Sequence, residues 1–264
     1  MGGSTPATFL GCYAKKLGNC DGRSNEHLIS KSILETIGLF EVEGLPWIPP
    51  GEKRALPATA LTASVLCRNH NAKLSKFDAE ANAFFKHLKL IDGMETPEEL
   101  QQVVPVEVID GIKLEKWLLK TLCGVLASGN FQLEGKGFGK LQVTDHLVDL
   151  LFSERKWKSG LGLYVQVKDR AQVNAWRGIG YHLVTARKGT HAEVVGIDVE
   201  FWGFPLRCMF ASKMGEPVSP GYRPRGLRFA NGAVSRELKL TWPKSSLTTG
   251  APTFTRTGTS RPPP

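Results

Sequence analysis

The chain of 264 residues is long enough for two domains, and 41% of its residues are apolar, which provides for a sizeable core. The net charge of +9 favours polyanionic partners by overall electrostatics but does not select one. No apolar run approaches the roughly 20 residues needed to cross a bilayer, and the N-terminus lacks the basic and apolar regions of a secretory signal. The five cysteines are odd in number and unevenly spread, which does not suggest a disulfide framework. We therefore expect a cytoplasmic protein with no membrane partner.

The first third of the chain predicts strand, strand and helix in that order, with turn-rich segments between them. Residues 27–29 are short and apolar enough for a strand, and residues 30–35 begin a short helix with Ser30 as a plausible N-cap. Residues 61–66 predict a second strand. Residues 71–90 carry apolar side chains at spacings of three and four, which is the period of a helix.

The rest of the chain predicts two helices followed by strands. Residues 112–127 form an apolar segment that predicts a well-buried helix, and residues 141–152 predict a shorter one. The later segments predict antiparallel sheet with one solvated face, at residues 161–167, 179–186, 192–202, 206–211 and 238–242. We expect an α+β protein with three parts: a small N-terminal domain at 1–100, an α+β accessory domain at 101–245, and a disordered tail at 246–264.

Four soft metal ligands lie in the N-terminal third: Cys12, Cys20, Cys67 and His70. The two residues between Cys67 and His70 allow both side chains to turn toward one ion, and thiolate and imidazole are the ligands that zinc prefers. Seven residues separate Cys12 from Cys20, where zinc ribbons have two to four. The alternative is a pair of ordinary thiols, with His70 capping a helix.

Two further polar groups lie between and beside these ligands. Glu26 can hold a hard divalent cation while the adjacent His27 takes a proton from water. Asn71 directly follows His70, and its side-chain carbonyl can bind a hard metal ion or, instead, cap the following helix. An acidic residue next to a histidine is common in proteins. Only the position of the Glu26–His27 pair between the two halves of the zinc ligand set favours a catalytic role for it.

The order Cys…Cys…Glu-His-Leu-Ile-Ser…Leu-Cys-x-x-His-Asn-x-Lys, over about residues 9–90, resembles the HNH endonucleases that carry a treble-clef zinc site. The resemblance implies a ββα-metal fold in which Cys12, Cys20, Cys67 and His70 hold a structural Zn²⁺. It implies that His27 activates water for attack on a phosphodiester. Glu26 and Asn71 would hold one catalytic Mg²⁺ or other divalent ion. Nucleases of this kind commonly belong to mobile elements or phage defence.

The sequence departs from the family pattern just before Cys67, where members have an asparagine that orients the histidine and this chain has Thr62 or Ser64. Four basic residues near the motifs are candidates for phosphate contact, or else belong to a solvated helix face: Lys31, Arg68, Lys73 and Lys76. We therefore expect a nuclease acting on nucleic acid, with DNA the first choice. The alternative is a non-catalytic zinc module that binds nucleic acid or protein, and residues 101–245 are the candidate region for a protein partner.

Overall fold

The computed structural model describes residues 8–37, 40–42, 45–49, 51–92, 108–133, 136–137, 139–154, 157–165, 179–188, 191–201, 204–211, 221–231 and 234–255. Its α-helices are α1 (Lys31–Ile37), α2 (Arg68–Asp92), α4 (Gly111–Ser128) and α5 (Asp145–Phe152), and two 3₁₀ turns are η1 (Lys15–Leu17) and η2 (Ala58–Ala60). The fold is mixed α+β with predominantly antiparallel sheets, as predicted.

Most of the strands belong to two sheets. The six-stranded sheet has the order β3-β2-β9-β10-β11-β8 and the four-stranded sheet the order β14-β12-β13-β5. Their strands are β2 (Phe40–Val42), β3 (Arg54–Leu56), β5 (Val108–Asp110), β8 (Gly162–Val165), β9 (Ile179–Lys188), β10 (His191–Phe201), β11 (Phe204–Met209), β12 (Gly226–Asn231), β13 (Val234–Thr241) and β14 (Thr253–Thr255). Two short pairs join β1 (Glu26–His27) to β4 (Thr62–Ala63), and β6 (Gln132–Leu133) to β7 (Lys136–Gly137).

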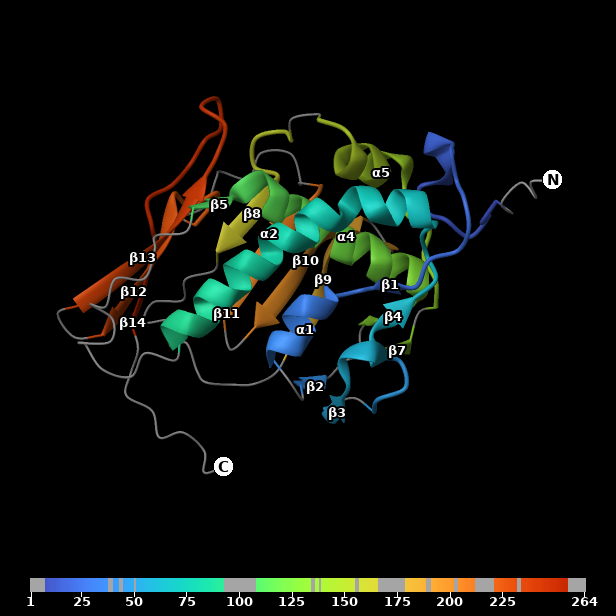
Figure 1. The fold of residues 1–264 in the computed structure, drawn as a ribbon, viewed down its shortest axis with the longest axis horizontal. Helices are drawn as coiled ribbons and strands as arrows, with labels where there is room; N and C mark the ends of the chain where they lie inside the picture. Colours follow the sequence, from blue (N-terminus) through green and yellow to red (C-terminus); the bar gives the residue numbers. More distant parts are fainter. Residues whose placement is uncertain are drawn as a thin grey trace, which may run out of the picture.

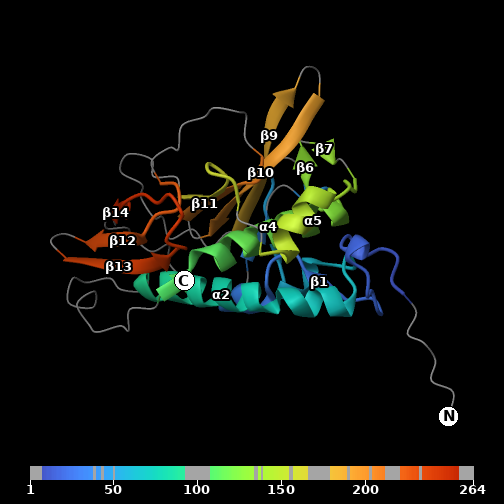
Figure 2. The ribbon, with the colours of Figure 1, turned by 90° about the horizontal axis from the view of Figure 1, so that it is seen from above.

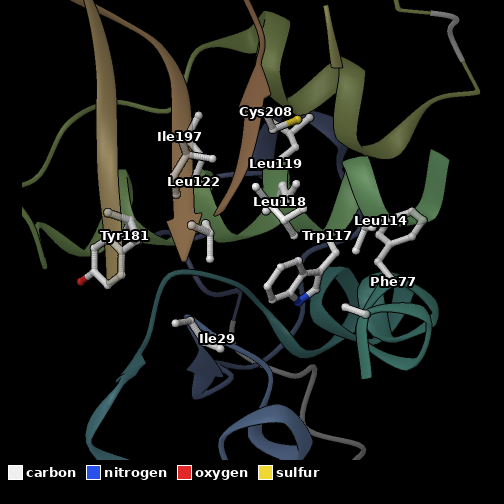
Figure 3. Packing of buried hydrophobic residues seen from close by; sticks show 14 of the residues in the cluster. Ile29, Phe77, Leu114, Trp117, Leu118, Leu119, Leu122, Tyr181, Ile197 and Cys208 are labelled. Atoms are coloured by element: carbon white, nitrogen blue, oxygen red, sulfur yellow. The ribbon is translucent and has the colours of Figure 1, made fainter. Parts of the chain in front are cut away.

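Helix α4 is the central element of the fold. The Asp110 side chain caps it by accepting hydrogen bonds from the backbone N–H groups of Ile112 and Lys113, and Gly129 ends it in a left-handed conformation. The helix lies between α2 and the six-stranded sheet (Figure 1). Figure 3 shows Trp117 of α4 near Phe77 of α2 and near Ile29. Ile197 and Cys208 of the six-stranded sheet lie across α4 from Phe77 and Ile29. One hydrophobic core therefore includes side chains from both ends of the chain.

The predicted domain boundary near residue 100 falls in 93–107, outside the described residues. Strands from the two sides of it share a sheet, because β2 pairs in parallel with β9 through Val42 and Ile179. In Figure 2, β9 and β10 extend beyond the helices as a two-stranded ribbon.

The tail also differs from its prediction in part. Residues 246–255 were expected to be disordered, but they include β14, which pairs in parallel with β12 and places Phe254 in the core. Residues 256–264 lie outside the described residues. Strand β14 has only one apolar side chain, Phe254, between two threonines. Such a short pattern does not predict a strand in a segment rich in Ser, Thr, Gly and Pro.

Candidate metal centre and the adjoining buried ion cluster

The short β1–β4 pair brings the two motif regions together at the start of α2. Glu26 lies opposite Ala63 and His27 opposite Thr62 in antiparallel register. An isolated bridge between Arg23 and Cys67 extends this pairing to the residue immediately before α2. The chain order strand, strand, helix predicted from the sequence is therefore present, although the second strand is limited to Thr62–Ala63.

The four predicted zinc ligands form one cluster. The ligand atoms of Cys12, Cys20, Cys67 and His70 all lie within 4.8 Å of one another, and these residues could hold a metal ion. The three sulfur atoms lie 3.5, 3.6 and 3.2 Å from the same ring nitrogen, His70 Nδ1. A tetrahedral zinc ion with ordinary bond lengths separates a sulfur from a nitrogen ligand by roughly 3.5 Å. The donor set and its spacing are therefore compatible with structural zinc.

The long spacing between Cys12 and Cys20 is accommodated by a compact loop. The 3₁₀ turn η1 occupies its middle, and Gly18 and Asn19 then reverse the chain with positive φ angles of 73° and 53°. Asn19 tolerates this conformation better than most residues with a side chain, and its backbone carbonyl accepts a hydrogen bond from the Asn69 side chain at 2.9 Å. The loop is thus tied directly to the first turn of α2.

The thiols of Cys12 and Cys20 are protonated when no cation is near them. Burial raises the pKa of Cys12, and burial together with the neighbouring Cys12 thiol raises the pKa of Cys20 to about 12. Burial also lowers the pKa of His70, so its ring is neutral and able to bind a metal. An ion at the centre would displace the thiol protons and supply the charge that thiolates require.

Glu26 is buried in a network of charged and polar side chains that extends into α4. Its carboxylate is 3% exposed and lies 2.5 Å from the Lys120 ammonium, which is 5% exposed. Lys120 Nζ also donates to both carboxylate oxygens of Asp78, at 2.7 and 2.6 Å. The Ser30 hydroxyl donates to Asp78 and accepts from Trp117 Nε1 at 2.8 Å. The cation beside Glu26 in this structure is therefore a lysine of the chain itself.

The charges in this network oppose the effect of burial. Burial raises the pKa of Glu26 and is only partly offset by Lys120. For Lys120 itself, burial lowers the pKa, but the attraction of Glu26 and Asp78 outweighs it, and its pKa is raised overall. The ammonium therefore stays charged.

His27 is half-buried on β1. Its Nε2 is buried and has no hydrogen-bond partner among the described residues. Burial, followed by the positive charges of Lys31 and Lys120, lowers the pKa of His27. A neutral imidazole with an unpaired ring nitrogen is the form that can accept a proton.

The side chains of Asn71, Thr62 and Ser64 form hydrogen bonds with residues other than His27. Asn71 lies in the first turn of α2, not at its cap, and its side-chain amide donates to Ser24 Oγ at 2.9 Å. Thr62 donates to the backbone carbonyl of Thr59 at 3.2 Å, and Ser64 donates to the side chain of Asn25 at 2.8 Å. Neither hydroxyl is hydrogen-bonded to the His27 ring.

The four predicted phosphate-contacting residues, Lys31, Arg68, Lys73 and Lys76, are all exposed. Lys31 pairs with Glu35 at 3.3 Å and Arg68 with Asp21 at 3.7 Å, which are surface interactions of low energy. The sequence analysis did not identify Lys120 as a neighbour of Glu26. The available signal was a lysine within the apolar run Leu118–Leu122 of α4, because a buried ammonium requires a counter-charge.

Comparison with protein-family models, with curated proteins and with solved structures gave no match for this chain. Among the described residues, none of the helices combines the length and the apolar character that crossing a bilayer demands.

Proposed function

We propose that the chain is a nuclease of the HNH type, stapled by a structural zinc ion, which hydrolyses phosphodiester bonds of nucleic acid, DNA in the first place. One observation carries the proposal. The four soft ligands converge where the segment before β1 meets the start of α2, and along the sequence they flank the β1–β4 pair that carries His27. That arrangement gives the resemblance over residues 9–90 a three-dimensional counterpart.

The zinc ion has a structural role in this proposal. All four tetrahedral positions are filled by protein side chains, three of them buried, so no position is open for water or substrate. The ion would fix the loop before β1 to the first turn of α2. The fold between these points, which includes His27, would be ordered with it.

His27 would act as the general base. Its ring is neutral, and Nε2 is buried and unpaired among the described residues. Once water enters beside Nε2, this nitrogen can take the proton of the water molecule that attacks the phosphorus atom. The exposed side chains of Lys31, Arg68, Lys73 and Lys76 would contact backbone phosphates, and the net charge of +9 attracts the polyanion over a longer range.

The catalytic divalent ion that the resemblance implies does not fit Glu26 and Asn71 as they are placed. The Glu26 carboxylate is neutralised by Lys120 at 2.5 Å, and the Asn71 side chain is bound to Ser24. We therefore derive no step through an ion at these two residues. An ion at Glu26 would require Lys120 to withdraw from a buried position.

A cleavage assay on supercoiled DNA with added Mg²⁺, Mn²⁺ or Ni²⁺ tests the proposal. His27→Ala should lower the rate about 10²–10⁴-fold, the usual contribution of a general base, while zinc content and thermal unfolding stay unchanged. His146→Ala is the matched control, since His146 is an exposed histidine on α5, and it should cleave like the parent. Cleavage that survives His27→Ala would show that the base is wrongly assigned.

A second function is favoured by the Glu26–Lys120 pair, which occupies the place expected of the catalytic ion. In that case the chain is a non-catalytic zinc module that binds nucleic acid or, through residues 101–245, a protein. Purified chain that contains zinc and retards DNA in a gel, but cleaves neither DNA nor RNA with any of the three ions, would establish this function instead.

A further inference from the structure

A cavity of about 240 Å³ lies on the opposite half of α4 from the Glu26 network. Its walls come from the first half of α4, from Glu154, Trp157 and Ser159 after α5, from Tyr222 and Arg223, and from the loop 243–247 after β13. It is larger than the cavity of roughly 150 Å³ that holds a benzene molecule. It can therefore take a ring with a further polar group.

Two buried donors on its walls lack an anionic partner. Trp157 is 7% exposed, and its indole Nε1–H has no hydrogen-bond partner among the described residues. Lys116 is 4% exposed and donates to the Ser153 carbonyl at 2.6 Å. Within the described part of the chain no carboxylate lies within the 4.0 Å of an ion pair with Lys116. Lys116 therefore has a neutral acceptor but no anionic one, whereas the unpaired indole N–H of Trp157 costs free energy that a bound acceptor would recover.

Arg223 forms another wall and is held in a strained conformation. Its φ angle of 41° is in the left-handed region, which a residue with a long side chain rarely adopts. Glu115, fully buried, holds the guanidinium with two hydrogen bonds of 2.8 and 3.0 Å. The guanidinium also lies 5.4 Å from the ring centroids of Tyr222 and Trp242. Strain of this kind persists where the surroundings fix it, and it is concentrated at ligand sites.

The charge on the cavity wall is positive where it is buried. Glu115 neutralises Arg223, which leaves the Lys116 ammonium as the buried charge without an ion-pair partner among the described residues. The one carboxylate in the cavity lining, Glu154, is exposed. Ile112, Pro243 and Leu247 add apolar surface to the walls, and Ser159, Ser245 and Ser246 add hydroxyl groups.

We propose that this cavity binds a small organic anion, with a flat apolar body and a carboxylate or phosphate group that accepts from Lys116 and Trp157. The apolar walls and Tyr222 would cover the body, and the ammonium would neutralise the charge. This site is independent of the nuclease proposal, because none of its residues takes part in the zinc cluster or the His27 region.

Calorimetry and thermal unfolding of the full-length chain test the site with three probes at millimolar concentration: phenylacetate, phenyl phosphate and the neutral phenylacetamide. Binding of at least one acid, tenfold or more tighter than the amide, supports the proposal, and the two acids distinguish a carboxylate ligand from a phosphate ligand. Equal or absent binding of all three overturns it.

Two variants and a matched control locate the binding. Lys116→Met keeps most of the side-chain packing and should weaken the acid at least tenfold, and Trp157→Phe should weaken it several-fold. Lys113→Met removes the same charge from the same helix at a partly exposed residue outside the cavity, and it should bind like the parent. An equal loss in Lys113→Met and Lys116→Met overturns the proposal. Because Trp157→Phe removes one donor and little volume, it gives an independent reading if Lys116→Met fails to fold.

Discussion

Replacing Lys120 by methionine is the perturbation that most directly tests the buried ion network. The ammonium is 5% exposed and contacts Glu26, which is 3% exposed, and Asp78, which is 25% exposed. Methionine retains most of the aliphatic packing, so the substitution mainly removes the charge. Leaving a buried carboxylate without its partner costs about 3–5 kcal/mol in the free energy of unfolding.

The loss should depend on pH, and its sign follows from Glu26. Burial already raises the pKa of Glu26, and without Lys120 it rises further. The folded variant then holds a proton at pH values where the unfolded chain has lost it. Its stability is retained below the ordinary glutamate pKa and is lost as the pH rises through the folded value, by up to about 1.4 kcal/mol per pH unit.

Urea unfolding at several pH values measures both effects. Lys113→Met is the control, because Lys113 is 41% exposed and its partners Asp110 and Glu80 are 40% and 15% exposed. Solvent screens this pairing more than that of Lys120, so its loss should lie nearer the roughly 1 kcal/mol of an exposed pair. The double variant Glu26→Gln/Lys120→Met removes both charges and should recover part of the loss. If Lys120→Met costs no more than Lys113→Met, or if its cost does not grow with pH, the reasoning about the buried network is refuted.

Two further predictions concern the metal and the sheet. Zinc should bind with a stoichiometry of about one per chain and raise the unfolding temperature. Calorimetry in buffers of different ionisation enthalpy should detect proton release, because burial holds the pKa of Cys12 above its usual value and that of Cys20 at about 12. Zinc binding without proton release would contradict the thiol assignment. Gly196→Ala should destabilise the chain by about 1–3 kcal/mol, since a Cβ at this position would lie 2.6 Å from a backbone carbonyl oxygen of β11. Gly180→Ala on the neighbouring strand β9 should be nearly neutral, because the nearest atom to its Cβ would be 3.8 Å away. Equal losses of stability for the two variants in urea unfolding would contradict this packing argument.

The zinc ligand set was predictable because its information is local and ordered. Cys67 and His70 are three residues apart at the start of a helix with strong apolar periodicity, and only one pair of cysteines precedes them. The helix itself and the buried α4 were predicted by the same periodicity, and both are confirmed with boundaries shifted by a few residues.

The Glu26 site was not predictable from the motif, since its decisive neighbour lies on a different element. Lys120 comes from α4, in a run that reads as apolar core, and no spacing rule connects it with Glu26. The same holds for β2, whose partner β9 comes from the far side of residues 93–107. Contacts between distant segments depend on how the layers pack, and a single sequence contains little information about that.

The Cys/His cluster and the buried ion network lie next to the same short strand. A metal ion held by the four residues of the cluster would fix the loop before β1 to α2, whereas Glu26, on β1 itself, is tied to α4 through Lys120. The position of His27, the next residue, therefore depends on α4, and in the proposal also on the metal. Residues 101–245 supply one of the two constraints on the proposed base, so they contribute to the geometry of the site as well as to any partner surface. This dependence also separates the two proposed functions. In a nuclease the Lys120 contact must leave the His27 ring accessible to water and phosphate, while in a binding module it needs only to hold β1 in place.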